Sequence, residues 1–590
     1  MGGKSGILAL VALGVALCAG PAAAACKLGL LAELPVTMDG LDPVVPAKIN
    51  GVDARLVADS GAFFSMVTPD AAARFGLKRG PLPQEMTVRG VTGEADVGVA
   101  TAKEFTFLGH SLHNIEFLVG GSAMDDGSYD GFLGQNVLNI ADVEFDFANG
   151  VIRLFKPTGC GHAVLTYRDK TLSGSALDIQ PTTSDESFVR TTASVDGARI
   201  VVLFDSGAER STLTLHAAKR SGITVGSPGV VAAGQTGGIG RRMVDTWIAP
   251  FSSFRIGDEE VRNTRLRIGA IEVADADMLL GADFFLSHRI YLSRGQSKLY
   301  FTYNGGPVFH LDGAQTQPPA AEPTAAGSPG QPAGEPKDAG GYSRRGSAFA
   351  ARRDFAHAIA DFTRAAELEP REPGHLYNRA VTRIAAGKPV EAMADLDQAL
   401  KLKPDHVEAL MRRGKLRLAN KDEAGARADL DSVSRLRPAS RLEIAEIYAG
   451  ARLFEPSVAL YGQWITDNPK AQPSERADVL NARCWTRALW GKELDHALAD
   501  CNEAGRLMPR SASLLDSRGM VHLRLGQFDE SIADYDAALR VQPKIAWSLY
   551  GRGLARLRKG MKAEGEADLK AAADVQPGIA DEAKGFGIEP

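Results

Sequence analysis

The sequence predicts a multidomain protein in which an all-β region precedes an all-α region. Short runs of β-branched and aromatic residues, broken by glycine and by a hairpin turn at Asn149-Gly150, fill residues 27–310. A stretch with almost no large apolar residue follows at 312–341, and a helical pattern rich in Ala, Leu, Arg and Asp begins at Tyr342. The chain of 590 residues is also longer than one domain normally is.

Composition excludes several classes of protein. Apolar residues make up 44% of the chain and charged residues 24%, which is ordinary for a soluble globular protein and excludes a disordered, collagen-like or multi-span membrane protein. The net charge of −5 gives no basic excess, so we expect no nucleic-acid partner. The HExxH and GxxxxGK[ST] motifs are both missing from the sequence, and we predict neither a metal nor a cofactor.

The first 25 residues have the order of a secretory signal peptide. Lys4 precedes an apolar core at 7–18, Pro21 interrupts it, and residues 22–25 are all alanine. We therefore expect a periplasmic protein with no membrane span after cleavage of the signal. Two alternatives stay open, an uncleaved membrane anchor and lipoprotein processing at Cys26.

The β region carries one motif twice. An apolar strand that ends in Asp59-Ser-Gly-Ala recurs as one that ends in Asp205-Ser-Gly-Ala. Downstream, an apolar-apolar-glycine sequence ending at Gly134 recurs at Gly281, at nearly the same distance from the aspartate. One Asp-Ser-Gly is common in turns, but two copies in matched contexts indicate a duplicated fold, with half one at 27–160 and half two at 161–311.

This pattern resembles the retropepsin-like (pepsin-type, clan AA) aspartic proteases, whose motif is Asp-Thr/Ser-Gly-Ala. The resemblance implies two small closed β-barrels in one chain, an internal pseudo-dimer whose two active-site loops meet at a shared cleft. It assigns the catalytic role to Asp59 and Asp205. It assigns the support of the active-site loops to Ser60, Gly61, Ser206 and Gly207.

The chemistry of this family explains why two aspartates are needed. Two carboxyl groups in contact share one proton, because ionising both is costly. The ionised group takes a proton from a water molecule that attacks the peptide carbonyl, and the protonated group donates to the carbonyl oxygen. The substrate is therefore expected to be a peptide or protein. The family also covers its cleft with glycine-tipped hairpins, for which the candidates are Gly90 and Gly93 in half one and Gly234 and Gly237 in half two.

The two halves differ beside their aspartates. Phe63-Phe64 in half one is replaced by Glu209-Arg210 in half two, which predicts an asymmetric cleft. The intact pair of motifs favours an active aspartic endopeptidase. The alternative is a catalytically weak or inactive peptide-binding scaffold of the same fold.

The helical region repeats a short unit after the linker at 312–341. A proline closes each unit at steps of 34, 34, 31, 40, 34 and 34 residues, and a small residue lies twelve positions earlier. The pattern resembles the tetratricopeptide repeat (TPR), a helix–turn–helix unit of 34 residues. We assign about seven repeats to 342–577, with the fourth degenerate, and a capping segment to 578–590. The closing prolines are Pro370, Pro404, Pro438, Pro469, Pro509, Pro543 and Pro577.

Stacked hairpins form a solenoid with a concave face, which this family uses to hold a protein partner. We therefore expect the repeats to recruit a substrate or partner, and the linker to separate two autonomous units. Cys484 and Cys501 fall on the two helices of the fifth unit, and we predict a disulfide between them. Whether Cys26 pairs with Cys160 stays open.

Overall fold

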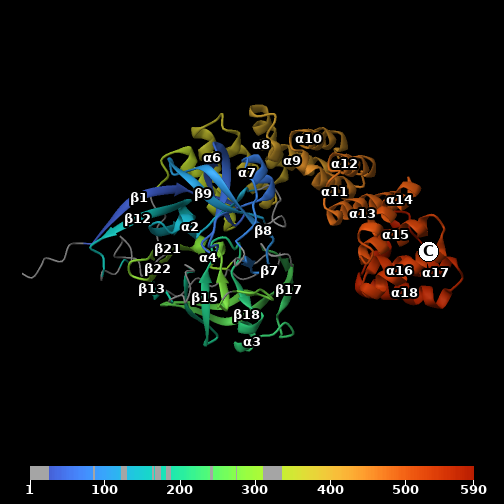
Figure 1. Ribbon diagram of the computed structural model, residues 1–590, viewed down its shortest axis with the longest axis horizontal. Helices are drawn as coiled ribbons and strands as arrows, with labels where there is room; N and C mark the ends of the chain where they lie inside the picture. Colours follow the sequence, from blue (N-terminus) through green and yellow to red (C-terminus); the bar gives the residue numbers. More distant parts are fainter. Residues whose placement is uncertain are drawn as a thin grey trace, which may run out of the picture. The chain divides into compact units, whose positions relative to one another are not determined.

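The structure is a computed structural model, and it describes residues 26–83, 87–120, 129–161, 165, 175–180, 188–238, 243–273, 275–309 and 335–589 (Figure 1). The predicted signal peptide and most of the predicted linker lie outside these residues. The chain forms two compact units, Met1–Gly387 and Lys388–Pro590. The N-terminal region is mostly β-sheet with two repeated units, and the C-terminal region is a series of helices, as the sequence predicts.

Half one forms a closed barrel. Its strands follow the order β2-β3-β4-β10-β5-β9-β8, and pairing of β3 with β8 closes the sheet. The short strand β10 runs parallel to β4 on one side and antiparallel to β5 on the other. It therefore holds the end of β4, which carries the first aspartate motif. The elements are β2 (Thr37–Asp39), β3 (Asp42–Ile49), β4 (Val52–Ala58), β5 (Met66–Val67), α1 (Pro69–Arg74), β8 (Val97–Phe107), β9 (His110–Gly120), β10 (Gly131–Leu133) and α2 (Gln135–Leu138).

Half two repeats this topology. The order β14-β15-β20-β16-β19-β18-β17, closed by β14 and β18, matches that of half one strand for strand from β3 to β8. Strand β20 again runs parallel to the strand that carries the aspartate motif and antiparallel to the next one. The elements are β14 (Arg190–Val195), β15 (Ala198–Phe204), β16 (Thr212–Thr214), α3 (Leu215–Arg220), β17 (Val231–Thr236), β18 (Val244–Ile256), β19 (Glu259–Gly269), β20 (Met278–Leu280) and α4 (Ala282–Ser287).

A third sheet joins the halves. Each half contributes one side, and β11 of half one pairs with β21 of half two, with Phe145 opposite Ile290. The turn predicted at Asn149-Gly150 connects β11 to β12, and Gly150 has a φ of 63° that favours glycine. The order is β1 (Lys27–Pro35), β12 (Val151–Thr158), β11 (Asp142–Asp146), β21 (His288–Ser293), β22 (Lys298–Tyr303) and β13 (Ser175–Asp178).

Cys26 is joined to Cys160 by a disulfide, which settles the pairing that the sequence leaves open. The bond ties the residue before β1 to the turn after the neighbouring strand β12.

Seven pairs of consecutive helices follow within residues 335–589, from α5 and α6 to α17 and α18, and hairpins form within each unit, as in α5–α6 and α9–α10. The fourth hairpin has the shortest first helix, in agreement with its degenerate sequence. The helices are α5 (Ala339–Ala351), α6 (Phe355–Leu368), α7 (Pro373–Ala385), α8 (Pro389–Leu402), α9 (Val407–Ala419), α10 (Glu423–Leu436), α11 (Arg441–Gly450), α12 (Phe454–Asp467), α13 (Pro473–Trp490), α14 (Leu494–Leu507), α15 (Ala512–Arg524), α16 (Phe528–Val541), α17 (Ala546–Arg558), α18 (Lys562–Val575) and α19 (Ile579–Lys584).

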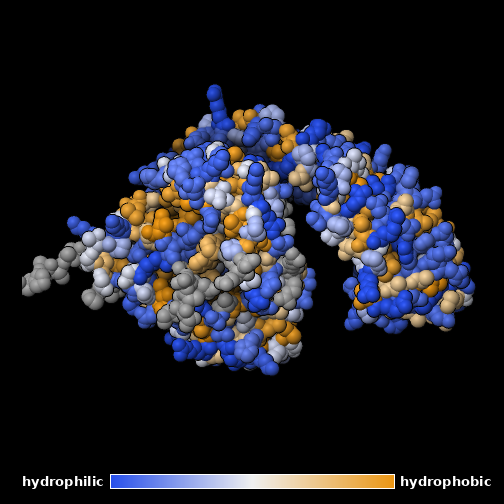
Figure 2. Space-filling view, viewed as in Figure 1, coloured by the Kyte–Doolittle hydropathy of each residue, from blue (hydrophilic) through white to orange (hydrophobic). Residues whose placement is uncertain are grey.

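The small residue of each repeat packs the two helices of a hairpin together. Ala392, Ala426 and Ala497 are fully buried, so a larger side chain at these positions would separate the helices. First helices of neighbouring hairpins contact each other, as in α13–α15 and α15–α17, and the described second helices make no comparable contacts. The first helices therefore lie on the concave side of the stack. Hydrophilic side chains cover most of the helices on the face seen in Figure 2.

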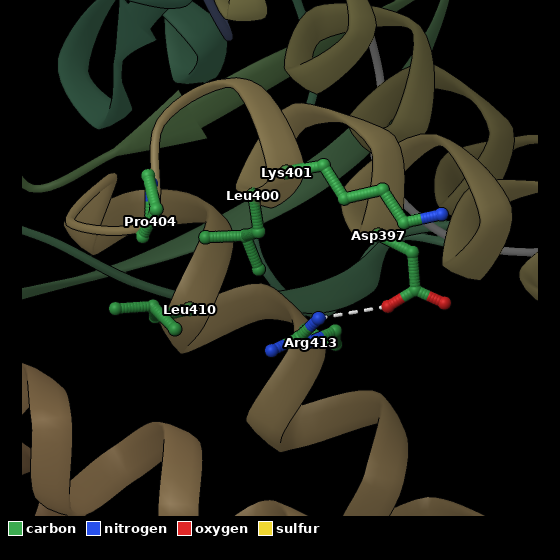
Figure 3. A pocket seen from close by; sticks show the side chains of 6 residues that line it. All are labelled: Asp397, Leu400, Lys401, Pro404, Leu410 and Arg413. Atoms are coloured by element: carbon green, nitrogen blue, oxygen red, sulfur yellow. Dashed lines mark hydrogen bonds and ion pairs between the residues drawn. The ribbon is translucent and has the colours of Figure 1, made fainter.

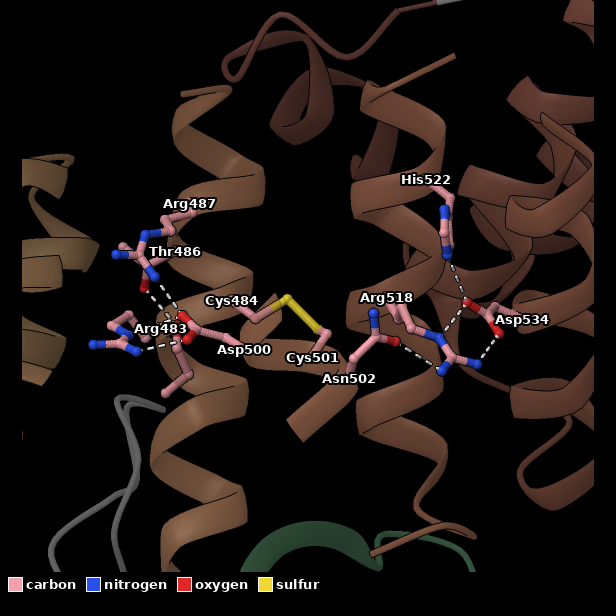
Figure 4. Close-up of a disulfide and its surroundings, with 11 residues drawn as sticks. Arg483, Cys484, Thr486, Arg487, Asp500, Cys501, Asn502, Arg518, His522 and Asp534 are labelled. Atoms are coloured by element: carbon pink, nitrogen blue, oxygen red, sulfur yellow. Dashed lines mark hydrogen bonds and ion pairs between the residues drawn. A yellow bond between two sulfur atoms is a disulfide. The ribbon is translucent and has the colours of Figure 1, made fainter. Parts of the chain in front are cut away.

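A disulfide joins the helices of the fifth hairpin. Cys484 of α13 and Cys501 of α14 are bonded, with their Cα atoms 5.7 Å apart (Figure 4). On the same hairpin, Arg483 and Arg487 both bind Asp500. The bond closes a short loop of 17 residues and restricts the separation of these two helices.

The first repeat helix packs on the β region, which corrects the expected tether. Helix α5 contacts β2, and Ala348 on α5 is fully buried in the same apolar cluster as both barrels. Arg352 at its end donates to the carbonyl of Gly305. Helix α5 also begins at Ala339, capped by Asp338, so residues 339–341 of the predicted linker are helical. Two glycines near its start lower the helix propensity of this segment, so propensity alone does not predict where the helix begins.

We predict that Ala348→Asp destabilises the β region by about 3 kcal/mol, because the substitution buries a charge without a partner. Hydrogen exchange of the full chain should show faster exchange in β2 and its neighbours. Ala360→Asp on the exposed side of α6 is the matched control and should change little. Equal exchange in both variants would show that α5 does not support the barrels.

Candidate active site and repeat surface

The structure brings the two predicted aspartates together. Asp59 follows β4 and Asp205 follows β15. The backbone N–H of each aspartate donates to the carbonyl of the last residue of β10 or β20, the short strand beside it. These bonds join Asp59 to the carbonyl of Leu133 at 3.0 Å and Asp205 to that of Leu280 at 2.9 Å. Both side chains are half-buried, so water still reaches them.

Crossed hydrogen bonds tie the two loops to each other. The hydroxyl of Ser60 donates to the carbonyl of Phe204 at 3.0 Å and accepts from the N–H of Ser206 at 2.9 Å. The hydroxyl of Ser206 makes the mirror-image bonds, to the carbonyl of Ala58 at 2.7 Å and from the N–H of Ser60 at 3.0 Å. Both serines are buried, so these bonds replace solvent contacts that the loops have lost.

The glycine of each motif makes room for the opposite aspartate. A Cβ atom at Gly61 would lie 2.3 Å from Cγ of Asp205, and one at Gly207 would lie 2.3 Å from Cγ of Asp59. The facing carboxylate would have to move to admit any other residue. The two carboxyl groups thus face each other across the glycine backbones of the two loops.

The environment raises the pKa of both aspartates. Burial is the largest cause for Asp59, the charge of Asp205 adds to it, and the pKa of Asp59 lies well above its ordinary value. The N–H groups of Gly61 and Ala62, each 2.8 Å from Oδ1, oppose this rise. Burial also raises the pKa of Asp205, and the hydrogen bond to Asp59 limits the rise. The pair therefore binds a shared proton more tightly than isolated carboxylates do.

A polar chain connects the first loop to the sheet between the halves. Gln135 donates to the carbonyl of Ser60 at 2.7 Å and accepts from Arg294 of half two at 3.0 Å. The N–H of Arg294 donates in turn to Asp142 on β11. Half two has Ala282 at the position of Gln135, directly after the matched glycine. Sequence reasoning missed Gln135, although the replacement of a polar residue by alanine directly after the matched glycine is a signal that reveals it.

The loops also differ where the sequence predicts asymmetry. The rings of Phe63 and Phe64 pack edge to face, 4.6 Å between centroids. Glu209 and Arg210 form an ion pair of 2.6 Å in their place. Equivalent contacts fix the two positions, because a Cβ at Gly134 would meet the backbone of Phe64 and one at Gly281 the backbone of Arg210.

The candidate flap of half one is a hairpin whose tip reaches half two. Strands β6 (Arg89–Gly90) and β7 (Gly93–Glu94) flank its tip, and the carbonyl of Val91 accepts from the N–H of Glu272 at 3.0 Å. Val91 also packs on the apolar cluster that Ala208 contacts, three residues after Asp205. The tip therefore lies near the loop of the second aspartate.

The candidate flap of half two lies within the described residues up to Gly238. Gly238 lies close to Val91, because a Cβ there would be 2.9 Å from its Cγ2. Gly237 precedes this contact. Gly234 instead occupies a β-bulge inside β17, with a φ of 78°, so it bends the strand and is not at the tip.

The repeat helices carry a regular series of ion pairs. Arg413 of α9 binds Asp429 of α10 at 2.7 Å. It also binds Asp397 of the preceding helix α8 at 2.8 Å, the bond drawn in Figure 3. Each such arginine joins two helices, so its main role is to hold the stack together. The same bond within a hairpin recurs in Arg345–Asp361, Arg483–Asp500, Arg518–Asp534 and Arg552–Asp568.

Neither a cluster of metal ligands nor a membrane-spanning helix occurs in the described residues. No group of three or more His, Cys, Asp and Glu side chains there is placed to hold a metal ion. Among the helices in the same residues, none combines the length and hydropathy that crossing a bilayer requires.

We predict that Ser60→Ala destabilises the protein by about 2–3 kcal/mol, because it leaves the buried N–H of Ser206 and carbonyl of Phe204 without their partner. Chemical denaturation measures this change. Ser60→Thr keeps the hydroxyl and should cost clearly less. Equal losses for the two variants would mean that the crossed hydrogen bonds contribute little.

We predict that Asp59→Asn stabilises the protein at pH 7. A carboxyl whose pKa is raised by folding favours the folded state only at low pH, and its contribution is lost as the pH rises through the raised pKa. Asparagine removes this loss, so the gain should shrink toward about pH 4, near the pKa of an unfolded aspartate. Denaturation at both pH values tests this, with the exposed Asp53→Asn as the control. A gain independent of pH would contradict it.

Comparison with known proteins agrees with both regions. The aspartyl protease family model matches residues 45–137 and 191–284, and the tetratricopeptide repeat model matches 343–405, 380–441 and 517–579. No curated protein matches the chain significantly.

Solved structures of repeat proteins are also similar to the chain. A TPR protein from Parabacteroides merdae is 17% identical, over 42% of this chain and 98% of its own, with a TM-score of 0.32. YrrB, described as a TPR protein with an unusual peptide-binding site, is 18% identical over 38% of this chain and 97% of its own, with a TM-score of 0.22. Yeast Tom70 is 17% identical over 42% and 54%, with a TM-score of 0.28. By its matches to the two family models, the chain combines a duplicated, retropepsin-like region similar to the aspartyl proteases with a C-terminal array of tetratricopeptide repeats.

Proposed function

We propose that the protein is an extracytoplasmic aspartic endopeptidase that hydrolyses peptide bonds with water activated between Asp59 and Asp205. The observation that carries this proposal is the facing pair of carboxyl groups, one from each barrel, with raised pKa values and no other ionisable group among the causes of the shift. Such a pair holds one proton over a wide pH range, which is the state that acid–base hydrolysis requires.

The pair suits both steps of hydrolysis. The ionised carboxylate takes a proton from a water molecule, whose oxygen then bonds to the carbonyl carbon of the substrate. The protonated carboxyl gives its proton to the carbonyl oxygen, and the resulting gem-diol collapses as the leaving nitrogen receives a proton. Neither aspartate forms a covalent bond to the substrate. The crossed bonds of Ser60 and Ser206 keep the two groups in register during both proton transfers.

A second candidate is a peptide-binding scaffold with little turnover. The contact between Val91 and half two favours this alternative, because the hairpin must move before a peptide can enter. Hinge motion of such hairpins is common in enzymes, so the same contact is compatible with an active protease. The aspartate substitutions below separate the two hypotheses.

The repeats are proposed to recruit a substrate or a protein partner through their concave face. Export from the cytoplasm is supported by the signal-like N-terminus and by two disulfides, since such bonds persist in oxidising compartments. With its Sγ in a disulfide, Cys26 has no free thiol for lipid attachment, which favours a periplasmic protein over a lipoprotein.

We predict that Asp59→Asn and Asp205→Asn each lower peptide cleavage by about 100- to 10,000-fold, because each removes one of the two proton-transfer groups. A diverse peptide pool incubated across pH and analysed by mass spectrometry measures cleavage. The exposed Asp53→Asn is the matched control and should cleave normally. Wild-type cleavage by either active-site variant would disprove the shared site. If the wild type cleaves nothing in the pool, the scaffold hypothesis is favoured.

A further inference from the structure

The chain ends in a segment that lies on the concave side of its own repeats. After α19, residues 585–589 contact side chains of α15 and α17, the first helices of the last two hairpins, and of the turn between α11 and α12. A helix that only covers the last hairpin has no need to reach the fourth one. The contacts with Arg452 and Phe454 therefore call for another explanation.

The repeats recognise the main chain of this segment. Arg452 donates to the carbonyl of Gly585 at 2.6 Å, and Arg524 donates to the carbonyls of Phe586 at 2.9 Å and Gly587 at 3.2 Å. Arg558 donates to the carbonyl of Glu589 at 3.1 Å and Tyr550 to that of Ile588 at 3.5 Å. Main-chain carbonyls outside helices and strands need partners from elsewhere, and cationic side chains are strong donors to them.

Arg524 is itself held in place by the repeats. Its Nε donates to the carbonyl of Ala488 at 3.0 Å and one Nη to that of Leu489 at 3.1 Å, both at the end of α13. The guanidinium thus bridges two neighbouring hairpins and also binds the tail, residues 585–589. This fixed geometry is typical of a prepared binding site, because little side-chain entropy remains to be lost on binding.

An aromatic site holds the side chain of Phe586. Its ring lies 6.3 Å from Phe454 and 6.4 Å from Trp547, measured between centroids, and the guanidinium of Arg452 covers it at 4.5 Å. Trp547 also packs edge to face on Trp485 at 5.4 Å. Aromatic rings and a cation from separate hairpins therefore converge on one ring.

We propose that residues 585–589 are a built-in ligand of a peptide-binding site on the concave face, and that a partner peptide competes with them. The partner is a short peptide with an aromatic side chain in the place of Phe586 and accessible main-chain carbonyls around it. This inference rests on the recruiting role proposed for the repeats and names its ligand. The tail then limits recruitment to ligands that bind more tightly than it does.

The size of the competition follows from the covalent link. A tethered segment acts at an effective concentration on the order of 1 mM. A free peptide with a Kd of about 0.1 mM should therefore bind the intact chain about tenfold more weakly than a chain without the tail.

The test uses the full chain carrying Asp59→Asn, so that cleavage does not interfere and binding is read separately from proteolysis. Fluorescence anisotropy measures binding of a labelled peptide with the sequence of residues 583–590 to the chain with and without residues 585–590. We expect saturable binding to the truncated chain and about tenfold weaker binding to the intact one. A peptide with Ala in place of Phe586 should bind neither, and Arg524→Gln in the truncated chain should abolish binding, whereas the exposed Arg540→Gln should not.

Truncation also removes Ile588, which is buried, so circular dichroism must show that the shortened chain is folded. If it is not, full-length Phe586→Ala keeps Ile588 and should bind the peptide more tightly than the parent chain. A folded truncated chain that binds no peptide up to about 1 mM overturns the proposal. Equal affinity of intact and truncated chains overturns it as well.

Discussion

The structure of the aspartyl-protease-like region depends on one constraint, the contact of two aspartate loops that belong to different barrels. Burying two carboxyl groups in contact costs free energy even when they share a proton, so other bonds must hold the loops together. Four crossed serine hydrogen bonds supply that force, and the two glycines let the carboxyl groups approach. Behind them, β10 and β20 anchor the loops, and the shared sheet fixes the distance between the barrels. The shared sheet thus positions the barrels, and β10 and β20 position the two aspartate loops.

The same contact makes the aspartate site electrostatically unfavourable, whereas the barrels around it are well packed. Burial and mutual repulsion raise the pKa of the aspartates, which costs folding free energy at neutral pH. The surrounding barrels compensate with continuous apolar packing that extends from half one through half two to Ala348 of α5. Active sites commonly combine a locally unfavourable arrangement with a rigid support.

Much of this arrangement could be predicted because its sequence motifs are repeated along the chain. Matched copies around Asp59 and Asp205 predict the barrels and the paired loops, and the regular prolines predict the helical hairpins. Several features that occur once were missed. Gln135 has no copy in half two, α5 starts with two glycines, and the tail at Phe586 contacts residues more than a hundred positions away. Gly234 was misplaced because a bulge and a hairpin tip both favour glycine.

The seam between β11 and β21 has an evolutionary consequence. In a symmetric dimer of identical chains, every substitution appears on both sides of the cleft, so a change that helps one side must be tolerated on the other. Here the two sides are encoded separately. Phe63-Phe64 and Glu209-Arg210 show that they have already diverged. A protein engineer can therefore redesign one wall of the cleft while the opposite wall keeps its original sequence.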